Sequence, residues 1–258
     1  MSTTYVLSPL VVGVFPAFPV DRFVHGSLDT TVVQAPCIAW LATGSDGSKV
    51  LVDTGPPMPT PLTAAFHMAL EVRPEHRIDQ ALRAEGVDPA DIQTVIFTHL
   101  HYDHCANGEL LPDARFLVQR EELRHAVLPN KDHRGAYEVG YQGVTPAWMA
   151  VFDRMSPVEG TVEVAPGCTM LHLPGHTPGS AGVVFTTSVG RVAVAGDLVN
   201  RLENWTGPHG DHAPPALFTD LTACGTSFAL LERSADQVLA SHDFRSTHPI
   251  PERALGDC

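Results

Sequence analysis

The segment from Thr98 to His104 concentrates side chains that can bind metal ions. It reads Thr-His-Leu-His-Tyr-Asp-His and supplies His99, His101, Asp103 and His104. In an extended segment, side chains at alternate positions project to one side, which would bring His99, His101 and Asp103 together. Imidazole nitrogen suits zinc and similar borderline metals, and a carboxylate adds a harder, charged ligand. The spacing therefore predicts a metal site.

Three more candidate ligands each follow a predicted strand. His176 lies in the Pro- and Gly-rich turn Leu173–Gly179, Asp197 comes just after Gly196, and His242 ends the last predicted strand. A single histidine is as often structural as it is a ligand. Because strand ends can converge at one edge of a sheet, we expect these three side chains to join the same site, where Asp197 could reach between two cations.

The pattern of apolar residues predicts the elements that position these side chains. Expected helices cover residues 75–85, 121–127 and 215–233, and expected strands cover 37–43, 49–53, 94–98, 115–119, 169–173, 182–186, 191–195 and 237–240. Residues 94–98 are apolar on both faces, as in a buried central strand, and lead directly into His99. Residues 128–157, with aromatic side chains among Gly and Pro, predict a helical insertion.

Two segments resemble each other and suggest that the chain has two related halves. Lys49–Asp53 and Arg191–Asp197 are both valine-rich strands that begin with a basic residue and end in Asp. A two-sheet sandwich with helices outside fits this pattern, with the ligands along the seam between the halves. No linker or low-complexity stretch divides the sequence, so we expect residues 1–258 to form a single domain.

Composition narrows the range of partners. The net charge of −13 and the pI near 5.4, without a Lys/Arg cluster, argue against nucleic acid or an anionic membrane as partner. Five cysteines without a CxxC pair argue against a disulfide framework. The apolar stretch Val6–Val20 lacks a basic leader and contains Pro9, Pro16 and Pro19, so we do not expect a signal peptide. With no apolar run long enough for a membrane span, the expected compartment is the cytoplasm.

Four motifs together resemble the metallo-β-lactamase superfamily. They are HLHYDH at 99–104, LPGHTPGS at 173–180, AGD at 195–197 and SHD at 241–243. The resemblance spans nearly the whole chain and implies an α+β fold, a four-layer αββα sandwich. It implies that one metal is held by His99, His101 and His176, that the other is held by Asp103, His104 and His242, and that Asp197 bridges both. Asp53, in a segment similar to the family's early strand, would support the metal loop.

Within that superfamily the chain is most similar to N-acyl-homoserine lactonases. The late His242, the run Phe116–Glu122 and the ending SHD carry this likeness. It implies a hydrolase with two divalent metal ions, expected to be Zn²⁺, that opens a lactone by a metal-bridging hydroxide, with Asp103 or Asp197 relaying a proton. Those lactonases place a Tyr three residues after the bridging Asp. Here Asn200 stands at that position, and we expect its amide to donate to the substrate carbonyl.

Other functions on the same site stay open at this point. A hydrolase of a thioester or β-lactam would use the same nucleophile with different pocket walls. An iron redox protein of this fold would usually carry Glu in place of His101 and an added flavodoxin domain. We expect a small-molecule substrate, with pocket walls formed by the aromatic residues of 15–23 and by Trp148, Met149 and Phe152, although either group could instead be core or the contact of a homodimer.

Overall fold

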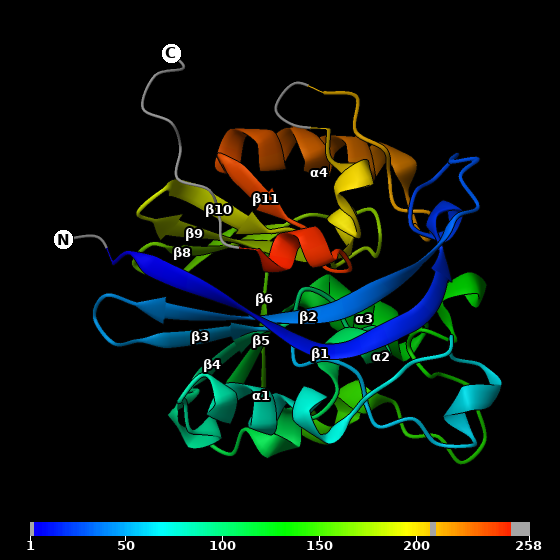
Figure 1. Ribbon diagram of the computed structural model, residues 1–258, viewed down its shortest axis with the longest axis horizontal. Coiled ribbons are helices and arrows are strands. Elements are labelled where there is room, and N and C mark those ends of the chain that lie inside the picture. Colours follow the sequence, from blue (N-terminus) through cyan, green and yellow to red (C-terminus); the bar gives the residue numbers. More distant parts are fainter. Residues whose placement is uncertain (1–2, 207–209, 249–258) are drawn as a thin grey trace.

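Two β-sheets lie face to face at the centre of the molecule (Figure 1). The computed structural model describes residues 3–206 and 210–248. The first sheet has the order β1-β2-β3-β4-β5-β6 and the second β11-β10-β9-β8-β7. The strands of the first sheet are β1 (Tyr5–Pro19), β2 (Val32–Gly44), β3 (Lys49–Val52), β4 (Thr94–Ile96), β5 (Arg115–Gln119) and β6 (Met155–Val158). Those of the second are β7 (Val162–Ala165), β8 (Cys168–His172), β9 (Ala181–Thr187), β10 (Gly190–Val194) and β11 (Gln237–Leu239).

Helices cover the outer face of each sheet. The α-helices are α1 (Ile78–Ala84), α2 (Tyr102–Cys105), α3 (Arg120–Val127) and α4 (Leu221–Ser234). In Figure 1, α4 lies above the second sheet and α1 lies below the first. One apolar core fills the space between the sheets, and two others join each sheet to its helices. The predicted four-layer αββα architecture is therefore confirmed.

The two sheets repeat one local topology, as the similarity of the two valine-rich segments suggests. β3 pairs antiparallel with β2 and parallel with β4. Its counterpart β10 pairs antiparallel with β9 and parallel with β11. Asp53 and Asp197 follow these two corresponding strands closely. Within residues 3–206 and 210–248, no helix combines the length and the apolar character that crossing a bilayer requires.

Strand β1 was not among the predicted elements. Its three prolines argue against a strand in a sheet interior, but β1 lies at the edge of the first sheet, where a missing N–H costs little. The register with β2 shifts between Val11 and Gly13 and again between Phe15 and Phe18. These irregularities bend the long strand and bring its aromatic end towards the metal-ligand candidates.

Other predicted elements differ mainly at their ends. Helix α4 begins at Leu221, later than predicted, because the Asp220 side chain caps it by accepting from the Ala223 amide. The short strands β6 and β7 were also missed. The predicted helical insertion at 128–157 contains 3-10 helix at Lys131–His133 and at Ala147–Arg154, the latter interrupted by a kink at Val151, rather than α-helices, and its last residues begin β6.

Two glycines allow the loops that carry His176 and Asp197 to turn sharply. Gly175 has φ +142°, and a Cβ there would lie 2.7 Å from the backbone nitrogen of Cys224 in α4. Gly196 has φ +56°, and a Cβ there would lie 2.9 Å from the Ala181 carbonyl oxygen. Because only glycine fits both restrictions without strain, the two loops approach the sheet and α4 closely.

Candidate metal centre

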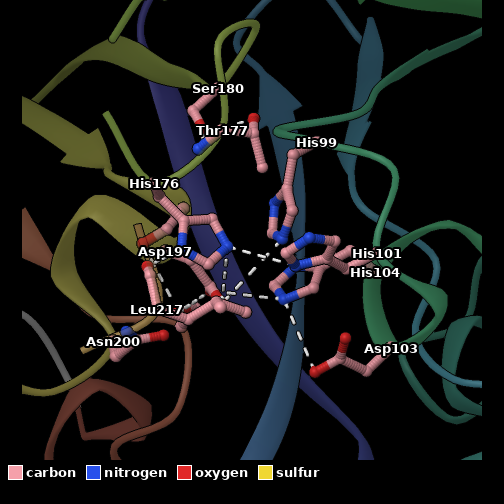
Figure 2. Close-up of polar contacts among 12 residues, drawn as sticks. His99, His101, Asp103, His104, His176, Thr177, Ser180, Asp197, Asn200 and Leu217 are labelled. Atoms are coloured by element: carbon pink, nitrogen blue, oxygen red, sulfur yellow. Dashed lines mark hydrogen bonds and ion pairs between the residues drawn. The ribbon is translucent and has the colours of Figure 1, made fainter. Parts of the chain in front are cut away.

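All seven predicted ligands meet where the strands of the two sheets end. Figure 2 shows His99, His101 and His104 on one side and His176 and Asp197 on the other, with Asp103 nearby. The potential ligand atoms fall into three overlapping groups, each spanning at most 4.8 Å: His99, His101, His176 and Asp197; His104, Asp197 and His242; Cys37, Asp103 and His242. The structure thus brings together predicted ligands that lie up to 143 positions apart (99 to 242).

Asp197 lies between the two sets of histidines. Its Oδ2 is 3.9 Å from His99 Nε2 and 3.6 Å from His176 Nε2. Its Oδ1 is 3.2 Å from His104 Nε2 and 3.3 Å from His242 Nε2. Ser241 donates to Oδ1 at 2.6 Å and helps to orient the carboxylate. Each oxygen of one carboxylate therefore faces a different pair of imidazoles, as in a residue that bridges two cations.

Hydrogen bonds on the outer side of the histidine rings set which nitrogen faces inward. His176 Nδ1 donates to the Leu217 carbonyl at 2.7 Å, and His242 Nδ1 donates to the Pro36 carbonyl at 2.9 Å. His104 Nδ1 donates to Asp53 Oδ2 at 2.9 Å. A ring whose Nδ1 carries the proton presents the Nε2 lone pair, so these three rings offer an acceptor nitrogen to a cation.

His101 is oriented the other way round. Its Nδ1 faces His176 Nε2 at 3.1 Å, inside the cluster, and its Nε2 is 3.3 Å from His133 Nδ1. His133 is buried and comes from the insertion at 128–157. If His101 offers its Nδ1 lone pair inward, its proton is on Nε2 and is donated to His133. No spacing pattern in the sequence pointed to His133, because it lies in an irregular segment.

The buried carboxylates of Asp53 and Glu122 accept hydrogen bonds from the loops that carry the candidate ligands. Asp53 accepts from the Thr98 amide and hydroxyl, both at 2.8 Å, besides its contact with His104. Its φ of 61° is unusual for a non-glycine residue and is fixed by these bonds. Glu122, fully buried in α3, accepts from the Leu100 amide and from the hydroxyls of Thr177 and Tyr137. It thus connects the loop after β4 to the loop that carries His176.

The predicted geometric reason for grouping Asp103 with His99 and His101 is wrong. Residues 102–105 form the short helix α2 instead of continuing the extended segment. Asp103 is consequently turned towards His242 and His104, with its Oδ2 at 3.7 and 3.8 Å from their Nε2 atoms. Asp103 thus lies beside the two histidines with which the family resemblance groups it, and its role as a ligand stays a prediction.

The chemistry of the donor set fits divalent metal ions. The Nε2 atoms of His99 and His104 are buried, and among the described residues neither has a hydrogen-bond partner. Burying such nitrogens unpaired is costly, whereas a cation would satisfy both. Imidazole and carboxylate are the ligand types of zinc and similar metals. The cluster therefore suits two divalent ions, one on each side of Asp197.

Electrostatics divide the cluster into two parts. Burial lowers the pKa of His99, His101 and His176, and neighbouring imidazoles lower all three further. Burial also disfavours a charge on His104, but the carboxylates of Asp197, Asp103 and Asp53 outweigh it and raise its pKa well above the usual range. The buried carboxylates thus attract positive charge, which protons or metal ions can supply.

Asn200 is placed against Asp197. When its amide is oriented to satisfy its neighbours, Nδ2 donates to Asp197 Oδ2 at 2.9 Å and to Oδ1 at 3.3 Å. Its side chain also lines the cavity beside the cluster. In this orientation the amide would help to orient the Asp197 carboxylate, and donation to a substrate carbonyl stays a prediction.

A cavity of about 330 Å³ opens beside the cluster. Phe15, Phe18 and Phe23 line it, as predicted, together with Phe66 from the segment before α1. Trp148, Met149 and Phe152 do not, because they line a separate apolar cavity on the insertion. The wall next to the metal-ligand candidates is therefore aromatic and comes mainly from β1 and the turn after it.

The αββα fold and the histidine-aspartate cluster define a class of metal-binding protein, and comparison with known proteins identifies the family. The model of the metallo-beta-lactamase superfamily matches residues 34–240. The chain belongs to this superfamily.

Individual proteins of this superfamily are also similar to the chain. An N-acyl homoserine lactonase of a Bacillus species is 27% identical over 186 residues, covering 63% of this chain and 65% of the relative. One from Bacillus thuringiensis is 30% identical over 132 residues, covering 51% and 48%. These alignments thus span about half to two thirds of the relatives' length.

Solved structures resemble the chain over more of its length. A quorum-quenching N-acyl homoserine lactone lactonase has a TM-score of 0.72 at 21% identity, covering 95% of this chain and 94% of that one. AidC, described as a dizinc quorum-quenching lactonase, has a TM-score of 0.63 at 16% identity, covering 94% and 86%. At these identities the likeness establishes the fold.

Proposed function

We propose that this chain is a two-metal hydrolase that opens a lactone ring, with N-acyl homoserine lactones as the substrate class. The observation that carries the proposal is the position of Asp197, whose two oxygens face two separate pairs of histidines. The two relatives described above are both named as N-acyl homoserine lactonases, which supports the choice of lactone.

Each ion would be held by its own set of side chains. His99, His101 and His176 would hold one, Asp103, His104 and His242 would hold the other, and Asp197 would bridge them. We expect the ions to be Zn²⁺ because most of these ligands are imidazoles. Bound there, two such ions would lower the pKa of a shared water and polarise a carbonyl group.

The surrounding residues would bind, orient and protonate the substrate. The aromatic wall of Phe15, Phe18 and Phe23 would take an apolar acyl chain, which water would otherwise surround. Asn200 holds the Asp197 carboxylate through its amide nitrogen. Asp103 lines the cavity, and its side chain is 12% exposed, so it can pass a proton to the leaving alkoxide.

A substrate panel tests this proposal. The metal-loaded protein is assayed by proton release on N-hexanoyl and N-decanoyl homoserine lactones, a simple γ-lactone, an acyl thioester and a β-lactam. We expect the acyl homoserine lactones to have the highest kcat/KM. We expect Asp103→Asn to lower kcat by about 10²-fold or more, and His248→Ala, at an exposed histidine, to leave it unchanged. Turnover of the thioester or β-lactam without lactone opening would refute the lactone assignment.

A further inference from the structure

Cys37 lies beside the ligands of the second proposed ion. It is in β2, is 1% exposed, and its Sγ belongs to a group with Asp103 and His242 whose ligand atoms all lie within 4.8 Å of one another. Four cysteines are described, and among them Cys37 alone belongs to such a group. The sequence alone does not distinguish Cys37 from the other four cysteines.

The strand that carries Cys37 also orients His242. The residue before Cys37, Pro36, accepts the Nδ1 proton of His242 through its carbonyl at 2.9 Å. The same hydrogen bond leaves His242 Nε2 free to face Asp103 and Asp197. Adjacent residues of β2 therefore fix the direction of one ligand and place a thiol next to it.

We propose that the Cys37 thiolate is a further ligand of the ion held by Asp103, His104 and His242, an inference that rests on the two-metal site of the proposed function. On binding, the S–H bond breaks, a metal–sulfur bond forms, and the proton is released to solvent. A coordinating divalent cation deprotonates a thiol outright, so the buried carboxylates nearby do not prevent the step.

A thiolate changes which metals this half of the site prefers. Asp103 and Asp197 are hard oxygen ligands that accept Mg²⁺ or Mn²⁺ readily, whereas sulfur selects softer ions such as Zn²⁺ and Co²⁺. If Cys37 only packs in the core, as other members of its apolar cluster do, the site has no soft ligand. The two cases therefore predict different absorption spectra for the protein with bound Co²⁺.

Titration of the metal-free full-length protein with Co²⁺ separates them. A thiolate bound to Co²⁺ produces an intense charge-transfer absorption in the near ultraviolet. We expect this band in the wild type, its loss in Cys37→Ser, and its retention in Cys105→Ala, which removes a buried thiol next to His104. Cys37→Ser should also weaken binding of one of the two ions by at least about tenfold.

The outcomes are distinct. Two bound Co²⁺ ions without the band, or a band that survives in Cys37→Ser, would overturn the role of Cys37 and leave the proposed function intact. A wild type that binds no Co²⁺ would overturn both. Cys37→Val, which preserves the apolar packing, serves if the serine variant does not fold, and the wild-type spectrum decides by itself if neither does.

Discussion

Single hydrogen bonds decide which nitrogen each histidine of the cluster presents. Asp53, Leu217 and Pro36 accept the outer protons of three rings, and His133 is in contact with the outer nitrogen of His101. Partners of this kind fix the tautomer and raise the basicity of a ligand. His101 differs from the other three rings, because its outer nitrogen contacts a second histidine, His133, instead of a carboxylate or a carbonyl.

Replacement of His133 should weaken metal binding through this contact. In His133→Leu the outer proton of His101 loses its acceptor, so we expect the affinity for the ion held by His101 to fall by about 10- to 100-fold in chelator competition. In His133→Asn the side-chain oxygen can occupy the place of Nδ1, and most of the affinity should return. Equal affinity in the leucine, asparagine and wild-type proteins would show that the contact is incidental.

At this scale the sequence predicted which side chains gather in the cluster, but not the residues that orient them. His99, His101 and His104 are recognisable because their spacing is short and regular. His133 and Cys37 carry no local pattern, since they reach the site only through the path of the insertion and the pairing of β2 with its neighbours. Asp103 was predicted to be a ligand for a reason that the turn into α2 removes.

Among the elements, helix α3 has a structural function beyond covering the first sheet. Its Glu122 is fully buried and accepts from the Leu100 amide and from Thr177 and Tyr137, which belong to three separate segments. Burial raises the pKa of Glu122, while these hydrogen bonds lower it. The helix thereby joins the loops that supply His99, His101 and His176.

Removal of this carboxylate should destabilise the metal-free protein. Glu122→Ala leaves buried donors without an acceptor, and we expect the free energy of unfolding in urea to fall by about 2–5 kcal/mol. Glu121→Ala is the matched control, because its exposed side chain pairs with exposed Arg124, and it should change stability by less than about 0.5 kcal/mol. Similar small losses in both variants would contradict the role of Glu122.

Element types were easier to predict than element ends. Short apolar runs predict the buried strands β4, β5 and β9, and turn residues predict the hairpin between β2 and β3. β1 was missed because its prolines argue against a strand unless the edge position is known, and sheet order is set by tertiary pairing. The 3-10 helices of the insertion lack a 3.6-residue apolar period, so sequence pattern suggested helix without its type.

For the whole molecule, metal binding and folding should be coupled. The seven candidate ligands come from both halves of the fold, so ions bound to them would favour the folded chain over the unfolded one. At a free metal concentration of about 100 times Kd, each site adds about 2.7 kcal/mol. Chelation should therefore lower the Tm of the wild type and have a smaller effect on Asp197→Asn. An unchanged Tm after chelation would show that the ligands do not hold ions in the folded protein.

The division of the fold into two sheets also explains why the site lies where it does. Strand ends of both sheets meet at one edge, and the loops that follow β4, β8, β10 and β11 all contribute candidate ligands there. A homodimer and a cytoplasmic location stay predictions from the sequence.

The number of metal ions per chain tests the central claim most directly. Protein purified without added metal, then saturated with Zn²⁺ and freed of excess, is analysed by elemental mass spectrometry alongside Asp197→Ala. The two-metal account predicts two ions in the wild type and fewer in the variant, because Asp197 faces both sets of histidines. One ion or none in the wild type, or two in both proteins, would contradict it.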